Sequence, residues 1–193
     1  MALATACSCL APAVLIAGTG LDTMQVGSLV SLGGGLGVVC IFIAGWNSDR
    51  SGDRLRDAFV LTVAIAAALL LLGVASRPAL VVVGYLLFSA TFFTAGMLIV
   101  SSWADLLHVR QLAVGSAAIN TLWQIGAFLS PYAWGVTKDA TGSFRAALIG
   151  ASVVVVAEAL VILYVRVRVM SERRERAAAM EQPLGVPSDF PRT

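Results

Sequence analysis

Long uncharged stretches alternate with short polar segments along the chain. Five of the stretches each approach or exceed the roughly 20 apolar residues that a helix needs to cross a bilayer. They cover approximately residues 26–46, 58–76, 79–103, 112–136 and 146–167, and of these the last contains charged residues, Glu158 and Arg166. Strands with open edges are not tolerated in hydrocarbon, because their backbone polar groups find no partner there. The pattern therefore predicts five membrane-spanning helices.

The first apolar stretch, residues 1–21, predicts a sixth helix that begins abruptly at Met1. Pro12 lies inside it and two glycines weaken its end. A secretory signal peptide would carry basic residues at its start, and none precedes Asp22. We therefore predict an all-α membrane protein whose residues 1–170 form a six-helix transmembrane bundle.

The composition supports this class. Hydrophobic residues make up 59% of the sequence and charged residues only 12%, whereas a soluble domain carries about 25% charged residues. No metal site is predicted, because the three cysteines lie in apolar stretches and His108 is the only histidine. We also find no nucleophile motif or phosphate-binding loop, and no soluble basic module for nucleic acid. We predict no enzyme activity and no cofactor.

The basic residues predict an orientation. Cytoplasmic loops of membrane proteins are enriched in Lys and Arg. With Met1 inside, three basic residues lie outside and ten inside, the latter being Arg50, Arg54, Arg56, Arg110, Arg166, Arg168, Arg173, Arg174, Arg176 and Arg192. This predicts a multi-pass protein of the inner cell membrane with a cytoplasmic C-terminus. The proline-containing tail, residues 171–193, is predicted to be cytoplasmic and largely disordered.

A short pattern occurs twice, after the second stretch and after the fifth. In each copy an Asp stands four residues after a Gly, and another Gly stands three residues after the Asp. The residues are Gly45, Asp49 and Gly52 in the first copy, and Gly135, Asp139 and Gly142 in the second. Three predicted crossings between the copies place them on opposite sides of the membrane. This is typical of a 3+3 inverted repeat, the architecture of secondary transporters.

Small residues predict close helix packing. Gly33 and Gly37 form a small-xxx-small pair, and Gly45 lies further along the same face. Gly126 and Ser130 repeat the spacing in the stretch of residues 112–136. Such faces let the backbones of neighbouring helices approach closely in lipid.

The first copy of the pattern is richly charged. Arg50, Arg54 and Arg56 alternate with Asp49, Asp53 and Asp57. These arginines can pair with the carboxylates or with anionic lipid headgroups. The sequence of residues 45–54 resembles the loop motif of the major facilitator superfamily. Residues 119–144 resemble the eleventh helix and following loop of its anion:cation symporter branch.

This resemblance covers nearly the whole chain but corresponds to only the second half of such a transporter, helices 7 to 12. It implies a gating or structural role for Gly45, Asp49, Arg50, Gly52 and Arg54. It also implies a small organic anion as substrate, with H⁺ or Na⁺ as coupling ion. A missing N-terminal half, or a second copy of the chain, would be needed for transport across the bilayer.

Four residues are candidates for the substrate or ion path, because the resemblance places their helices beside it. They are Asn120, Gln124, Ser89 and Phe92. Asn120 and Gln124 are four residues apart and share one helix face. Amides at membrane depth can bind a carboxylate or a cation, or they can bond to a neighbouring helix.

Glu158 is the acidic residue well inside a predicted span, which makes it a candidate proton site. The alternative is a carboxylate that reaches toward the cytoplasmic surface near Arg166. Together these features predict a secondary transporter, or a fragment of one, that moves small organic anions by ion-coupled alternating access. The alternative is a non-transporting remnant or an accessory membrane subunit.

Overall fold

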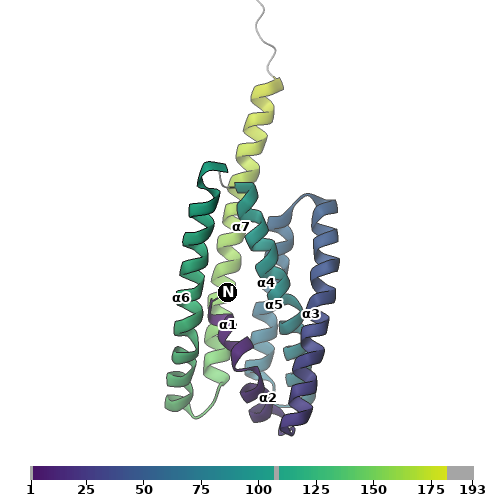
Figure 1. Cartoon of the computed structure of the whole chain (residues 1–193), viewed down its shortest axis with the longest axis vertical. Coiled ribbons are helices and arrows are strands. Elements are labelled where there is room, and N and C mark those ends of the chain that lie inside the picture. Colours follow the sequence, from purple (N-terminus) through teal and green to yellow (C-terminus); the bar gives the residue numbers. More distant parts are fainter. Residues whose placement is uncertain (1, 107–108, 182–193) are drawn as a thin grey trace, which may run out of the picture.

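A computed structural model describes residues 2–106 and 109–181, and these form an all-helical bundle (Figure 1). No strand occurs in this part of the chain. The helices are α1 (Ala2–Cys9), α2 (Ala11–Thr19), α3 (Thr23–Ser51), α4 (Arg54–Val74), α5 (Pro78–Leu106), α6 (Val109–Thr141) and α7 (Arg145–Glu181). Five of them, α3 to α7, are long and apolar enough to cross a membrane. The prediction of a helical membrane protein is confirmed at this level.

The first segment differs from the single helix predicted over residues 1–21. It consists of two short helices, α1 and α2, that meet at Leu10. Pro12 stands in the first turn of α2, where its missing N–H costs little, although the same residue would interrupt a continuous helix. Gly20 ends α2 with φ of 68°. Neither helix is long enough to span a membrane by itself.

The long helices continue beyond the apolar stretches that predicted them. The α3 helix begins after Asp22, whose backbone N–H donates to the Gln25 side chain at 3.3 Å. The α6 and α7 helices likewise run into polar sequence. Hydrophobicity marks only the membrane-embedded part of a helix, which explains the shorter predictions. The α7 helix continues through Glu181, into the tail that was predicted to begin at residue 171, and residues 182–193 lie outside the described residues.

The helices pack around α4 and α5, which lie along each other. The α7 helix packs along α4, and α3 packs along α5. The predicted close packing of Gly33 and Gly37 is confirmed, because a Cβ on Gly33 would lie 2.9 Å from Ser89 Oγ and one on Gly37 would lie 3.3 Å from the Ser89 carbonyl oxygen. Gly45 differs from that prediction, since no neighbouring atom lies within 4 Å of where its Cβ would stand.

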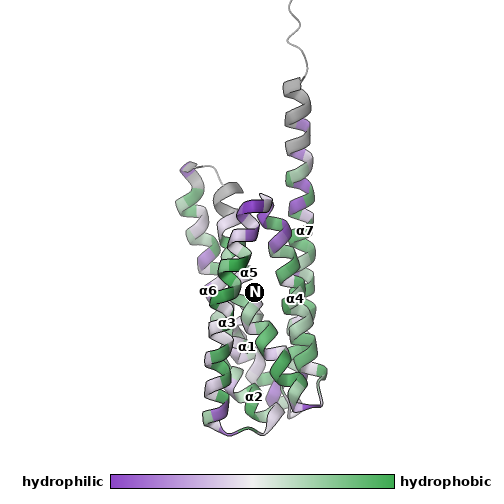
Figure 2. Cartoon of the chain, turned by 90° about the vertical axis from the view of Figure 1, so that its right-hand side faces the viewer, coloured by the Kyte–Doolittle hydropathy of each residue, from purple (hydrophilic) through white to green (hydrophobic). Residues whose placement is uncertain are grey.

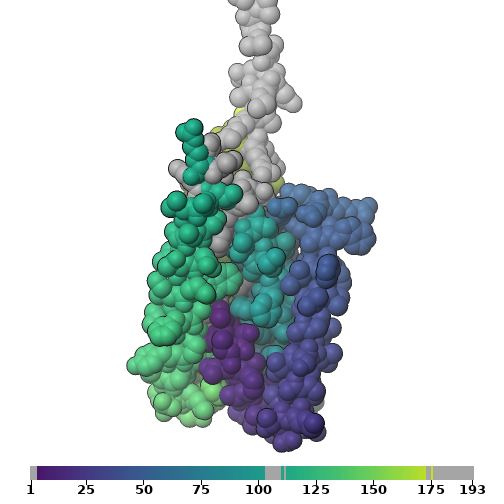
Figure 3. Space-filling view, viewed as in Figure 1, coloured from purple at the N-terminus to yellow at the C-terminus, as the bar shows by residue number. Residues whose placement is uncertain are grey.

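The two short helices, α1 and α2, are packed among the long helices. On the face seen in Figure 3, α1 and α2 are seated between α6 and α3. The α1 helix packs on α6 and α7, whereas α2 packs on α5 and α3. Their small and apolar side chains are buried in the core: Ala4, Ala6, Cys7, Ala11, Val14 and Leu15.

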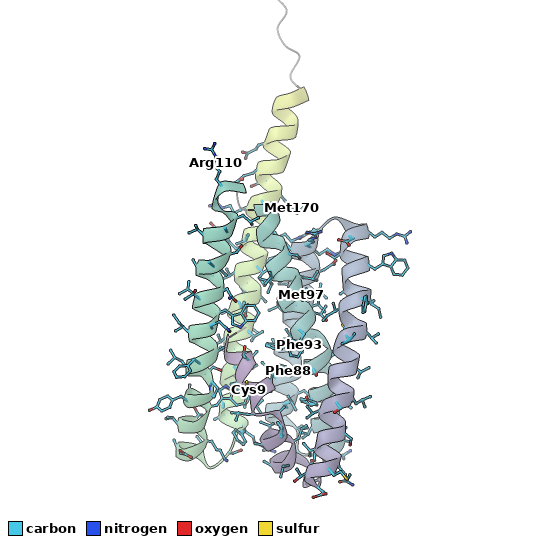
Figure 4. All side chains as sticks on the ribbon, in the orientation of Figure 1. Cys9, Phe88, Phe93, Met97, Arg110 and Met170 are labelled. Atoms are coloured by element: carbon cyan, nitrogen blue, oxygen red, sulfur yellow. The ribbon has the colours of Figure 1, made fainter. Side chains whose placement is uncertain are left out.

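Charged residues collect at the two ends of the bundle (Figure 2). The α3–α4 turn, the start of α6 and the C-terminal part of α7 share one end (Figure 1). Arg110 projects from α6 at that end (Figure 4). The α4–α5 and α6–α7 turns, with their three basic residues, share the other end. Which end faces the cytoplasm stays a prediction.

Candidate functional site

The turn between α3 and α4 holds the first copy of the repeated pattern. Gly52 follows α3 with φ of 67°, a left-handed conformation that glycine adopts without steric cost. Its N–H donates to the Ser48 carbonyl at 3.0 Å. Asp53 then caps α4, and its carboxylate accepts from the Arg56 backbone N–H at 3.0 Å. The Gly-Asp pair therefore ends one helix and starts the next.

The carboxylate of Asp49 is paired within the same turn. Arg54 Nη2 donates to Asp49 Oδ1 at 3.2 Å. Asp49 is exposed, and so is Arg50 beside it. An exposed pair of this kind contributes little to stability. Its placement suits a surface contact at the membrane face better than a buried catalytic role.

Asp57 forms a second, more buried cluster under the turn. Its Oδ2 accepts from Asn47 Nδ2 at 3.4 Å and from Ser51 Oγ at 3.3 Å. Arg56 Nε lies 3.9 Å from the other carboxylate oxygen. Asp57 is in the first turn of α4, where the helix dipole favours a negative charge. These contacts join the end of α3 to the start of α4.

Asp53 makes a long-range ion pair that sequence reasoning missed. Arg166 of α7 donates to Asp53 Oδ2 from Nη2 at 2.7 Å and from Nε at 2.9 Å. Both side chains are about three-quarters buried, with 25% of Arg166 and 28% of Asp53 exposed. The hydrogen bond from Arg166 is the main reason that the pKa of Asp53 lies below its ordinary value of 3.8. No spacing rule relates two residues that are 113 positions apart.

The opposite end of the same two helices is also fixed by an arginine. Arg145, at the start of α7, donates from Nη2 to the Ala75 carbonyl at 3.1 Å and lies 3.5 Å from Ser76 Oγ. Between the two arginines, Gly73 of α4 touches α7 so closely that a Cβ there would lie 2.9 Å from Ile149 Cγ1. We call this arrangement, defined by Arg145, Arg166 and their partners on α4, the two-ended clamp.

A small cavity lies behind the motif, between α3 and α5. Its volume is about 170 Å³, and its lining includes Gly45, Ser48 and Asp49 of the motif and Thr94 and Met97 of α5. The Ser48 hydroxyl is buried and has no hydrogen-bond partner in the described part of the chain. The missing side chain of Gly45 leaves this space open rather than tightening the helix contact.

The second copy of the pattern repeats the backbone geometry of the first. Gly142 follows α6 with φ of 70°, and its N–H donates to the Lys138 carbonyl at 2.7 Å. Gly52 has the same conformation after α3. Asp139 is exposed, and no atom of a neighbouring element lies within 4 Å of a Cβ built on Gly135. The two copies therefore share a helix-ending glycine, and within the described residues an ion pair is found for Asp49 but not for Asp139.

The two amides of α6 lie on the outside of the bundle. Asn120 and Gln124 are both exposed near the middle of this 33-residue helix. Trp123, between them in sequence, faces α5 instead, and its Cη2 lies 3.1 Å from where a Cβ on Gly96 would stand. Neither amide lines the cavity of about 170 Å³ between α3 and α5.

The two candidates on α5 have a different environment. Ser89 is buried against α3 beside Gly33. Phe92 is buried too, and its ring stacks on Phe88 at 5.2 Å between centroids. Phe88 lies on the α5 segment seen in Figure 4. The structure therefore does not bring the four path candidates together in one of the described cavities.

Glu158 is partly buried in the middle of α7. The arginine that the sequence suggested as its neighbour, Arg166, is bound instead to Asp53. Arg166 thus fixes α7 to α4. The proton-site role of Glu158 stays a prediction.

Five candidate spans in an all-helical bundle define a multi-pass membrane protein. Two curated relatives add the class of function. A quinolone resistance transporter of Acinetobacter baumannii is 27% identical over 168 residues, which cover 83% of this chain and 37% of the relative. A putative tartrate transporter of Agrobacterium vitis is 27% identical over 129 residues, which cover 67% of this chain and 29% of the relative.

The aligned region thus spans about a third of the length of these relatives. No protein-family model and no solved structure matches the chain. The two relatives support a transport function and a non-enzymatic role.

Proposed function

We propose that this chain is the C-terminal half of a major facilitator superfamily transporter of the anion:cation symporter-like branch. It moves a small organic anion by alternating access, coupled to H⁺ or Na⁺. The motif of residues 45–54 supports the superfamily, and the relative named for tartrate, a dicarboxylate, supports an organic anion. The membrane is the inner cell membrane, and the C-terminus is cytoplasmic.

The observation that carries this proposal is the exposure of two amides at membrane depth. Asn120 and Gln124 lie near the middle of α6, and none of the most apolar 18-residue part of that helix is buried. An amide left facing hydrocarbon costs several kcal/mol by order of magnitude. Polar groups within membranes instead face protein or a water-filled cavity. This face of α6 therefore borders a transport path.

The missing side of the path is supplied by six further helices or by a second copy of the chain. In alternating access, two bundles rock about a central site, and ion binding biases which side is open. The two-ended clamp makes α4 and α7 a support, whereas α3 and α6 present their open faces to the partner bundle. The motif turn, with Asp49 and Arg54 on its surface, lies where the two bundles would meet at one membrane face.

The test is uptake of radiolabelled tartrate into proteoliposomes. The chain is reconstituted alone and together with a six-helix unit encoded upstream of it, under an inward H⁺ or Na⁺ gradient. Replacing both amides, N120L together with Q124L, is expected to lower gradient-driven uptake at least tenfold. The matched control is Thr121→Val, because the Thr121 hydroxyl is exposed on the same helix but already donates to the Ala117 carbonyl.

Uptake that survives loss of both amides would contradict their role in the path. An equal loss of uptake in Thr121→Val would mean that α6 does not tolerate substitution here. The loss of uptake in the double variant would then be due to impaired folding. No gradient-driven uptake in either preparation, across tartrate and a quinolone probe, would favour the alternative of a non-transporting remnant or accessory subunit.

A further inference from the structure

A second and larger cavity lies at the end of the bundle opposite the motif turn. Its volume is about 700 Å³, within the range of about 300–1,000 Å³ that small-molecule sites occupy. Its walls come from α2, α4, α5 and α7 and from the α6–α7 turn. None of the four path candidates and none of the residues of the α3–α4 turn lines it.

One side of this cavity is apolar. Its side chains come from four different helices, so the surface is formed only in the folded bundle. They are Val14 and Ile16 of α2, Leu72 of α4, Val81 of α5 and Leu148 of α7. Such a surface binds hydrocarbon, because each buried CH₂ contributes about 0.8 kcal/mol.

Two cations, Lys138 and Arg145, also line the cavity. Lys138 Nζ lies 4.6 Å from the centre of the Phe144 ring, and Arg145 uses Nη2 to bond the end of α4. No carboxylate in the described part of the chain is ion-paired with either residue. Asp139, next to Lys138 in sequence, is not part of the lining. The guanidinium has five N–H donors, so Arg145 keeps capacity for an anion.

We propose that this cavity binds an anionic amphiphile, with its phosphate or carboxylate head at Lys138 and Arg145 and its hydrocarbon tail on the apolar wall. Arg and Lys form strong charge-assisted hydrogen bonds with both kinds of head. The head lies at the membrane surface, since Lys138 is in the last turn of α6 and Arg145 is the first residue of α7, and the tail extends toward α2 and α4. Two sources carry this chemistry, a bilayer phospholipid and a free single-chain carboxylate.

The experiment measures lipid retained by the full chain, by native mass spectrometry from mild detergent. The probes are phosphatidylglycerol, which is anionic, and phosphatidylcholine of the same chain length, which is zwitterionic. Lys138→Gln is the first variant, because Lys138 Nζ lies over the Phe144 ring and its side chain makes no interhelical hydrogen bond or ion pair within the described residues. We expect phosphatidylglycerol affinity to fall about tenfold, the loss of one charge-assisted bond, and to fall further when R145Q is added.

The matched control is Arg77→Gln. Arg77 is the third basic residue at this end of the bundle, is exposed, and does not line the cavity. Its loss is expected to leave retention unchanged. Equal losses in the Arg77 and Lys138 variants, or equal retention of the two lipids by the unmodified chain, would overturn the proposal.

A filling variant tests the tail separately. Ala17 lines the cavity from α2, so A17F is expected to lower lipid retention by filling the space. A157F, on the exposed face of α7, is expected to leave retention unchanged.

Competition then identifies whether the bound amphiphile is a phospholipid or a free carboxylate. Displacement by decanoate supports a site open to free single-chain carboxylates, and failure of decanoate to displace the lipid supports a phospholipid site. Displacement by inorganic phosphate alone, or full retention in A17F, would overturn the role of the tail.

Discussion

The α4–α7 pair and the α3 and α6 helices show opposite kinds of packing. In an apolar 18-residue part of each span, 50% of α4 and 33% of α7 are buried, compared with 17% of α3 and none of α6. The α4–α7 pair is fixed at both ends by arginines. Many large apolar side chains of the other two helices are exposed, among them Phe42, Trp46, Leu122, Phe128 and Tyr132. The α4–α7 pair is therefore held together at both ends, whereas α3 and α6 each have a face that no other described helix covers.

This difference in burial indicates that the hydrophobicity of a helix and its burial are separate properties in a membrane bundle. The α3 helix is nearly as apolar as α4, yet it is much less buried. What distinguishes α4 is a close glycine contact at Gly73 and polar anchors at both of its ends. Four measurements test this comparison between the α4–α7 pair and the α3 and α6 helices.

The largest effect is expected at the closest contact of the support. Gly73→Leu would force a side chain into Ile149 and the α7 backbone, and overpacking typically costs about 1–3 kcal/mol. We expect the upper end of that range in the free energy of unfolding in mild detergent. Gly45→Leu is the control, because no neighbouring atom lies within 4 Å of its Cβ position. Equal destabilisation by both variants would contradict the comparison.

The next effect concerns the clamp. Arg166→Leu removes the partner of the partly buried Asp53 carboxylate, and we expect the free energy of unfolding to fall by about 1–2 kcal/mol. Arg168→Leu is the matched control on the same helix, since Arg168 is exposed and contacts only Tyr164 of its own helix. A thermal unfolding midpoint that drops equally in both variants would mean that the Asp53–Arg166 pair does not fix α7 to α4.

The same ion pair predicts a pH dependence with a definite sign. The folded-state pKa of Asp53 lies below its ordinary value of 3.8, chiefly because Arg166 donates to the carboxylate. The contribution of the pair is therefore complete above pH 3.8 and is lost as the pH falls through the lowered folded-state pKa. The stability difference between the unmodified chain and Arg166→Leu should shrink in acid. A difference that grows below pH 3.8 would show that the sign is wrong.

The smallest effect is expected on the open side of the bundle. Gly135→Ala places a methyl group where no neighbouring atom lies within 4 Å, and alanine favours a helix over glycine by about 0.5–1 kcal/mol in water. We expect a small gain in thermal midpoint for the chain alone. If a partner bundle covers this face, as proposed, the same variant should instead weaken assembly with that partner.

The sequence was sufficient for the parts of the fold that depend on local pattern. The apolar stretches located α3 to α7, and the Gly-x-x-x-Asp-Arg-x-Gly spacing marked the turn where Gly52 takes its left-handed conformation. The spacing of Gly33 and Gly37 predicted a close helix contact, and the partner in the structure is α5. These features follow from hydrophobicity, glycine stereochemistry and helix periodicity, which act over a few residues.

Long-range partners could not be obtained in this way. The Asp53–Arg166 and Arg145–Ala75 contacts arise because α4 and α7 lie antiparallel, which no local pattern specifies. The break at Leu10 was also missed, because Pro12 within an apolar stretch is compatible with either a kink or a new helix start. The exposed position of Asn120 and Gln124 depends on how α6 is rotated against α1, α7 and α5, which no local pattern specifies.

The break between α1 and α2 has a mechanical consequence. On one side of Leu10 the chain is attached to α6 and α7, and on the other side to α5 and α3. Pro12 has no N–H, so the backbone ladder is weakened at this joint. A displacement of α6 relative to α5 would therefore be accommodated by bending of the backbone at Leu10. The α1 helix would then move with α6 and α7, whereas α2 would stay with α5 and α3.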